Sequence, residues 1–318
     1  AVATTYPGTP STEIGDTLFR LSEHTDRYYF EFSTNEKVAL EVAAGAAIAG
    51  VRALCFMKHV GVNVASDPLM TLAYLGVNAG LVLVTADEPG CHSSQNEQDN
   101  RLYARLANLP LLEPSTPEEA RRLTRYAFDL SERLKLPVLM RTTTRVSHMR
   151  GVVTQEPLPA EVQRTAQFER DPSRFSYNPN VAKRRRRWLL DRMAEAESIA
   201  EEDPVWNPVL GDGDVGILVS GVGFNYVRDA LVELGLENTV RVGKLAFSHP
   251  VPRGWLTRFL TGLEHCLVVE EVEPLLEQQA KAVAHEAGLP VAVHGRTTDH
   301  FTRYGELTLS KVVTGLSR

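Results

Sequence analysis

Three segments in the first third of the chain carry side chains suited to binding and to acid–base chemistry. The first is the turn 6–12, with the sequence YPGTPST, which combines proline, glycine and hydroxyl residues. The second is Glu36, an acid at the start of an alanine-rich stretch, and the third is the polar loop 87–101. A turn like 6–12 leaves backbone N–H groups and hydroxyls free at a helix start, where a polar ligand can bind. A plain capped turn is the alternative interpretation.

The loop 87–101 is rich in hydrogen-bond donors. We expect His92, Gln95, Asn96 and Arg101 to suit a carboxylate and a keto oxygen, because the Arg101 fork can bind a carboxylate through two hydrogen bonds. The alternative for each residue is a polar loop that folds on itself and serves a subunit contact.

The elements that must position these segments alternate between strand and helix, which predicts a parallel sheet covered by helices. A helix is expected from Ser33 or Thr34 as cap to about Gly50. A second helix begins near 115–117 and runs to about Leu134, since a cap, a proline and two acids stand at its start. The expected strands are 53–56, 81–85, 111–113 and 138–141.

A second α/β unit follows a connector. Residues 151–208 are rich in proline and polar residues and contain the basic run 183–187, followed by one amphipathic helix to about Glu202. Beyond them, strands are expected at 215–220, 240–245, 266–270 and 291–294, with a helix at 226–234. The sequence therefore predicts two parallel-sheet α/β domains, at 1–150 and 209–318, joined by the connector 151–208.

Composition excludes several function classes. The net charge of −6 does not favour nucleic acid, and a basic run in a connector is more often a solvated helix face. The three cysteines are scattered, so neither a disulfide framework nor a metal or iron–sulfur site is expected in this chain. No apolar run is long enough to span a membrane, and we expect a cytoplasmic protein with further residues upstream of Ala1.

These motifs resemble the 2-oxoacid:ferredoxin oxidoreductase family, in its indolepyruvate alpha-subunit type. The turn 6–12 is similar to the start of that family's thiamine-pyrimidine domain, and FSTNEKVALE at 32–41 with Gly45 looks like its glutamate-bearing helix. The loop DEPGCHSSQNEQDNR at 87–101 is similar to the indolepyruvate branch. The second unit, with SGV at 220–222 and VVEEVEP at 268–274, resembles a transketolase C-terminal-like domain.

The resemblance implies roles for individual residues. Glu36 would be the carboxylate that activates thiamine diphosphate, because that cofactor needs a carboxyl group on its aminopyrimidine ring nitrogen in a largely dry site. By the same resemblance, Thr9 would contact the cofactor. Gly61, for the cofactor, and His59, for the substrate, are further candidates from their place after the strand that begins at Ala53, and a satisfied structural histidine is the commoner explanation for His59. The structural alternative for Glu36 is an acid that complements the helix dipole and stabilises the helix by under about 1 kcal/mol. Glu41 is its rival on the same helix.

The resemblance also implies an activity. It is the oxidative decarboxylation of an aryl 2-oxo acid, such as indolepyruvate or phenylpyruvate, to an acyl-CoA with reduction of ferredoxin. Thiamine diphosphate, coenzyme A and iron–sulfur clusters would take part in the complete, oligomeric complex. A GDG sequence at 211–213 imitates a diphosphate–Mg²⁺ motif but lacks the strand before it, so we interpret it as an interdomain turn. Mg²⁺ would then be held by another region or chain.

Three alternatives remain open from the sequence. The chain could be a non-catalytic α/β assembly subunit of such a complex. It could also belong to a non-oxidative decarboxylase, or to a dehydrogenase that passes its acyl group to lipoamide. Nucleophilic catalysis by Cys91 with His92 is a weak third, because adjacent side chains rarely point at each other.

Overall fold

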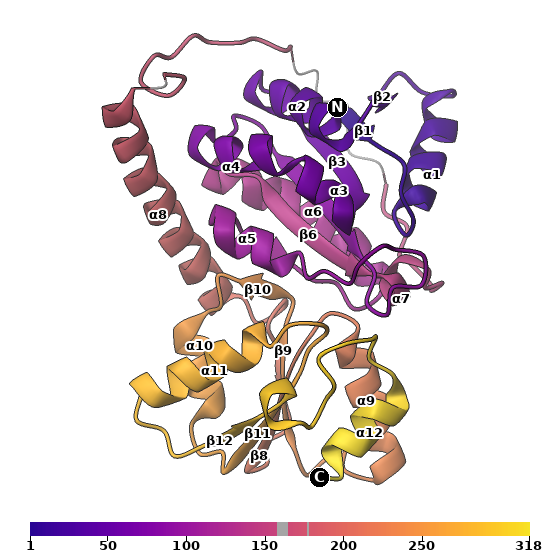
Figure 1. Ribbon diagram of the computed structural model, residues 1–318, viewed down its shortest axis with the longest axis vertical. Coiled ribbons are helices and arrows are strands. Elements are labelled where there is room, and N and C mark those ends of the chain that lie inside the picture. The colour runs from indigo at the N-terminus through magenta and orange to yellow at the C-terminus, as the bar shows by residue number, and fades with distance from the viewer. Residues whose placement is uncertain (158–164, 177) are drawn as a thin grey trace.

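The computed structural model describes residues 1–157, 165–176 and 178–318 and has two α/β units (Figure 1). The larger sheet has the strand order β10-β5-β6-β4-β3-β1-β2, and all neighbours are parallel except β10 with β5. Its strands are β1 (Val2–Thr5), β2 (Tyr29–Phe32), β3 (Ala53–Lys58), β4 (Leu81–Asp87), β5 (Leu111–Leu112), β6 (Val138–Thr143) and β10 (Phe247–His249).

Eight helices precede the second sheet in the described part of the chain. They are α1 (Thr12–Ser22), α2 (Glu36–Ile48), α3 (His59–Val64), α4 (Ser66–Leu75), α5 (Arg101–Ala107), α6 (Pro117–Leu134), α7 (Thr144–Ser147) and α8 (Pro179–Glu202). Of these, the sequence predicted α2, α6 and the connector helix α8. The predicted start and end of α6 are confirmed, with Thr116 as its cap. The predicted cap of α2 is wrong: Asn35 accepts the N–H of Val38 at 2.9 Å, whereas the Ser33 hydroxyl donates to Glu31.

The second sheet has the order β12-β11-β8-β9-β7 and is parallel except for the short edge strand β7. Its elements are β7 (Val209–Leu210), β8 (Val215–Ser220), α9 (Gly223–Leu234), β9 (Arg241–Leu245), α10 (Arg253–Leu260), β11 (His265–Val269), α11 (Leu275–Glu286), β12 (Ala292–His294), a 3₁₀ turn η1 (Arg296–Thr298) and α12 (Leu309–Leu316). Alternate residues of β8 and β11 enter two separate apolar clusters, one with α10 and α11 and the other with α9 and α12. Both faces are therefore covered, as parallel sheets require.

The predicted fold class, two α/β units, is confirmed, with one antiparallel edge strand in each sheet. Strand β10 comes from the second half of the chain but pairs with β5, and Phe247 lies fully buried in the core of the first unit. The chain thus crosses between the units three times: after α8, into β10 and out of β10.

The connector helix begins earlier than expected, because the basic run 183–187 is already inside α8. Its residues Leu189, Met193 and Ala196 pack into the core of the first unit, so α8 lies along that unit (Figure 1). Arg185 stacks on Trp188 and donates to the carbonyl of Tyr74 at 2.6 Å. Within the described parts of the chain, none of the helices combines the length and the apolar character that crossing a membrane requires.

Candidate active site

The three segments singled out in the sequence meet at the carboxyl edge of the first sheet. Strands β1, β3, β4 and β6 are neighbours in register, and the turn 6–12, helix α3, the loop 88–100 and α7 follow their ends. In open α/β sheets this edge is where ligands bind. The order of the strands therefore brings together residues that are more than a hundred positions apart in the sequence.

Glu36 is the first residue of α2, and its half-buried side chain lies against Gly61 of α3. A Cβ placed on Gly61 would stand 2.6 Å from Cγ and 2.8 Å from Oε1 of Glu36. The carboxylate has no hydrogen-bond or ion-pair partner among the residues that the structure describes. Two residues predicted from the sequence are thus in contact, and the carboxylate is free to bind a donor.

The turn 6–12 packs against the end of β3. A Cβ on Gly8 would stand 2.9 Å from Cβ of Lys58, so only glycine fits at this crossing. Ser11 is buried and donates its hydroxyl to the Gly8 carbonyl at 2.7 Å. Thr9 is exposed at the edge, with its hydroxyl 3.3 Å from that of Thr12. The structure therefore places Thr9 on the surface of the turn.

His59 begins α3 and is fully buried. Its Nε2 lies 3.3 Å from both the carbonyl and the side-chain oxygen of Asn96, so the loop 88–100 covers it. Its Nδ1 has no partner within the described parts of the chain. The backbone carbonyl of His59 accepts hydrogen bonds from Gln98 and Asn100, which fixes the start of α3.

Lys58 and Glu88 form an ion pair at this edge that the sequence analysis missed. Lys58 Nζ lies 3.1 Å from Glu88 Oε2, and both side chains are largely buried. Burial alone would raise the pKa of Glu88, but hydrogen bonds from Ser94 and Lys58 outweigh it and lower the pKa. A charged residue directly at the end of a buried strand was the signal that could have identified Lys58.

The remaining loop residues have different surroundings. His92 is exposed and faces Glu306 of the second unit at 3.3 Å, a carboxylate that also pairs with Arg145. Gln95 is exposed, and the Asn96 amide donates to Gln98 at 3.3 Å. Of the predicted substrate ligands, the structure brings His59 and Asn96 into contact and turns His92 toward the second unit.

Arg101 does not present a free fork, contrary to the expectation. Its guanidinium is buried and donates to Asp99 at 2.6 and 2.9 Å, and to Glu270 of the second unit at 2.7 Å. It also donates to the carbonyls of Glu271 and Glu273. Every guanidinium nitrogen donates a hydrogen bond within the protein, so we interpret Arg101 as a structural residue that links the two units and not as a ligand for substrate.

A buried network of charged residues surrounds Arg101, and it was not expected from the sequence. Arg141 donates to Asp87 at 2.6 Å and to Glu113 at 2.7 Å. Burial alone would raise the pKa of Asp99, but Arg101 and Arg141 outweigh it and lower the pKa to about 2. The network ties β4, β5, β6 and the loop together behind the site.

Known proteins resemble the chain over nearly all of its length. The family model of pyruvate flavodoxin/ferredoxin oxidoreductase, thiamine diphosphate-binding, matches residues 1–199. The model of the indolepyruvate ferredoxin oxidoreductase middle domain matches residues 207–289. These matches confirm the resemblance drawn from the motifs.

Two curated relatives illustrate the similarity. Both are called indolepyruvate oxidoreductase subunit IorA. That of Methanothermobacter thermautotrophicus is 52% identical over 99% of this chain and 51% of its own length. That of Pyrococcus abyssi is 44% identical over 98% of this chain and 48% of its own. The chain therefore spans about half the length of these relatives.

Solved structures show the same fold at low identity. A 2-oxoglutarate:ferredoxin oxidoreductase from Magnetococcus marinus superposes with a TM-score of 0.73 at 16% identity, covering 99% of this chain and 61% of the other. A split-gene transketolase superposes with a TM-score of 0.62 at 18% identity, covering 99% and 90%. Because the first family model matches well over half of its residues, this chain belongs to the pyruvate flavodoxin/ferredoxin oxidoreductase family of thiamine diphosphate-binding proteins.

Proposed function

We propose that this chain supplies the carboxylate that activates thiamine diphosphate in an oxidoreductase acting on 2-oxo acids. One observation carries the proposal: Glu36 is half-buried, has no partner among the described residues, and rests on a glycine at the carboxyl edge of the sheet. An unpaired carboxylate in such a place is costly unless a ligand satisfies it. The family match gives the ligand class independently.

The residues at the edge fit this cofactor. When bound, thiamine diphosphate supplies a carbon nucleophile and an electron sink for decarboxylation. Glu36 would hold a hydrogen bond at the ring nitrogen of the aminopyrimidine, and Gly61 provides the room for that carboxylate. Thr9 would offer its hydroxyl from the turn, and Gly61 its backbone. The helix-dipole interpretation explains why an acid is tolerated at this position, but not why Gly61 is needed beside it.

The substrate contacts are proposed from the loop 88–100. His59 and Asn96 touch each other at the edge, so one or both would face the keto acid, while His92 and Gln95 lie in the exposed part of the loop. The buried pair of Lys58 and Glu88 holds the loop against β3. Because this buried pair holds the loop, the exposed donors of His92 and Gln95 are not needed for that purpose.

We propose an aryl 2-oxo acid as the substrate, because the relatives are called indolepyruvate oxidoreductases. The products would be an acyl-CoA, CO₂ and reduced ferredoxin. The diphosphate with its Mg²⁺ and the iron–sulfur clusters would be held by other regions or subunits of an oligomeric, cytoplasmic complex. We also propose that the chain divides into domains at 1–150 and 209–318, joined by the connector 151–208.

The test is coenzyme A-dependent reduction of a viologen dye by the intact protein with indolepyruvate, phenylpyruvate and pyruvate in turn. We expect activity with the aryl acids to vanish in Glu36→Gln and to persist in Glu41→Gln. Glu41 is a matched control, because it is an exposed acid on the same helix beside Lys37. Activity that survives in Glu36→Gln would refute the role of Glu36. No activity with any 2-oxo acid, in protein loaded with cofactor and clusters, would favour the assembly-subunit alternative.

A further inference from the structure

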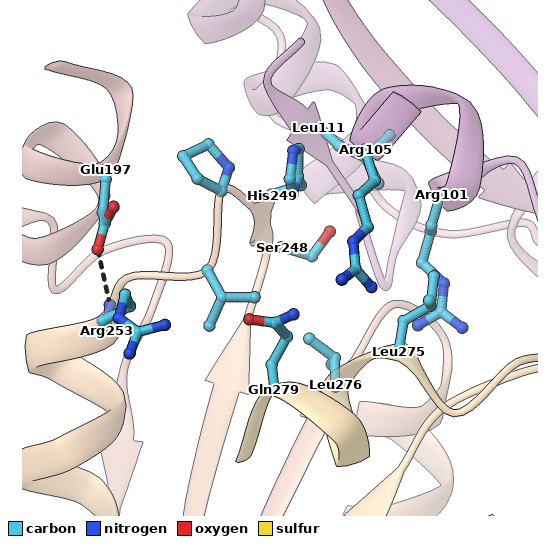
Figure 2. A pocket seen from close by; sticks show the side chains of 12 residues that line it. Arg101, Arg105, Leu111, Glu197, Ser248, His249, Arg253, Leu275, Leu276 and Gln279 are labelled. Atoms are coloured by element: carbon cyan, nitrogen blue, oxygen red, sulfur yellow. Dashed lines mark hydrogen bonds between the residues drawn. The ribbon is translucent and has the colours of Figure 1, made fainter. Parts of the chain in front are cut away.

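A pocket of about 200 Å³ lies between the two units, away from the carboxyl edge around Glu36. Its walls come from α5, β10, α8, α10 and α11 (Figure 2). Strands β5, β6 and β4 lie between β10 and β3 in the sheet, so the pocket is separate from the site around Glu36. Pockets for drug-sized ligands are larger, which points to a small ligand.

The polar groups of the pocket are few and converge. Figure 2 shows the Arg105 guanidinium, the Ser248 hydroxyl and the Gln279 amide turned toward the same space. Ser248 is only 5% exposed, and its hydroxyl has no partner in the part of the chain that the structure describes. A buried hydroxyl without a partner is unusual and suggests that a ligand completes it.

Of the three arginines that line the pocket, one has no partner within the described part of the chain. Arg101 is neutralised by Asp99 and Glu270, and the Arg253 guanidinium pairs with Glu286. Glu197, at the opposite end, accepts the backbone N–H of Arg253 at 3.4 Å. Among the described residues, the Arg105 side chain has no ion-pair or hydrogen-bond partner.

His249 stands beside Arg105 and remains neutral near neutral pH. Burial, and to a smaller extent the Arg105 charge, lower the pKa of its imidazole to about 4. It can therefore donate or accept one hydrogen bond without adding a competing charge. The rest of the lining is largely apolar and includes Leu111, Leu275 and Leu276.

We propose that this pocket binds a small monocarboxylic acid with an aromatic or branched apolar body. The carboxylate would meet Arg105 and the Ser248 hydroxyl, and the body would lie on the leucines. A bidentate guanidinium–carboxylate contact fits Arg105, and the volume corresponds to about six or seven water molecules, which is the size of one small aromatic acid. This inference does not depend on the proposed function, since Glu36 is not among the residues that line the pocket.

The probe is indole-3-acetate, measured by equilibrium dialysis with the intact protein, and indole-3-acetamide is its neutral analogue. We expect the acid to bind at one saturable site per chain. Its affinity should fall about tenfold or more in Arg105→Gln and by a smaller factor in Ser248→Ala. The parent protein should bind the amide about tenfold or more weakly than the acid. The control is Arg228→Gln, which removes an exposed arginine on α9 that also has no side-chain partner among the described residues, and it should bind as the parent does. Glu36→Gln should also bind normally, which separates this pocket from the active site.

Equal affinity in Arg105→Gln and the parent, or equal affinity for acid and amide, would overturn the proposal. Absence of any saturable binding would overturn it as well. Loss of binding in Glu36→Gln, with retention in Arg105→Gln, would place the acid at the active site and not in this pocket. Arg105 is exposed, so the variant should keep the parent's melting temperature, which is measured alongside.

Discussion

Replacing Gly61 by alanine should displace the Glu36 carboxylate. The new Cβ would stand 2.6 Å from Cγ and 2.8 Å from Oε1 of Glu36, whereas carbon atoms in contact prefer about 3.5–4.0 Å. The glutamate must therefore withdraw by about 1 Å. A displacement of this size in a catalytic group costs on the order of a hundredfold in rate. Alanine itself is favoured over glycine in a helix by about 0.5–1 kcal/mol, so no loss of backbone stability is expected.

The assay is the viologen-reduction rate of the intact Gly61→Ala protein with indolepyruvate, together with titration of thiamine diphosphate. We expect kcat to fall about a hundredfold and cofactor affinity to fall with it, while the melting temperature stays near that of the parent. Gly45→Ala is the matched control. Gly45 lies on α2, the helix of Glu36, and a Cβ there meets no atom within 4 Å.

Parental kcat and cofactor affinity in Gly61→Ala would refute the reasoning, because they would show that the contact does not fix the carboxylate. A fall of equal size in Gly45→Ala would refute it too, since a Cβ on α2 far from the carboxylate should not matter. Loss of activity with a lowered melting temperature in Gly61→Ala alone would mean that the contact supports the fold and not the position of Glu36.

The remaining predictions concern the contacts between the units. Arg101→Met removes the guanidinium that pairs with the buried carboxylates of Asp99 and Glu270. The free energy of unfolding in urea should therefore fall by about 3–5 kcal/mol, and a loss below about 1 kcal/mol would contradict the role of Arg101 in holding the units together. The pKa of Asp99 is about 2 in the fold and about 3.9 unfolded, so its stabilisation is present above pH 4 and is lost as pH falls toward 2. Asp99→Asn should flatten the pH dependence of unfolding in that window, and an unchanged slope would count against the assignment. Glu306→Gln removes the negative charge that pairs with Arg145 and faces His92, so limited proteolysis should cut the loop 88–100 sooner, with stability reduced by no more than about 1 kcal/mol. An unchanged cleavage rate would show that the loop is held by other contacts.

The sequence predicted those parts of the fold that local patterns determine. The strand at 53–58 and the helix 117–134 carry their own signals, in apolar runs and in a capping sequence. Glu36 was identified because a motif surrounds it, and Gly61 because it follows a predicted strand. Their contact is consistent with both assignments but does not test them chemically.

Long-range partners explain what the sequence could not predict. The carboxylate of Glu270 that holds Arg101 is 169 positions away, and no local pattern distinguishes a free arginine from one paired at such a distance. Strand β10 is three residues long. It pairs with β5 of the first sheet, and not with the second sheet that surrounds it in the sequence, because Phe247 packs in the core of the first unit. The cap of α2 is Asn35 and not the predicted Ser33 or Thr34, and the Ser33 hydroxyl instead donates a hydrogen bond to Glu31.

Strand β10 limits how modular the chain can be. If the chain were cut at the connector, the first unit would lose Phe247 from its core, and the apolar strand β5 would become an open sheet edge. Open apolar edges recruit other chains into aggregates. The two units should therefore melt in one calorimetric transition, and a gene split between them should yield fragments that need each other to stay in solution.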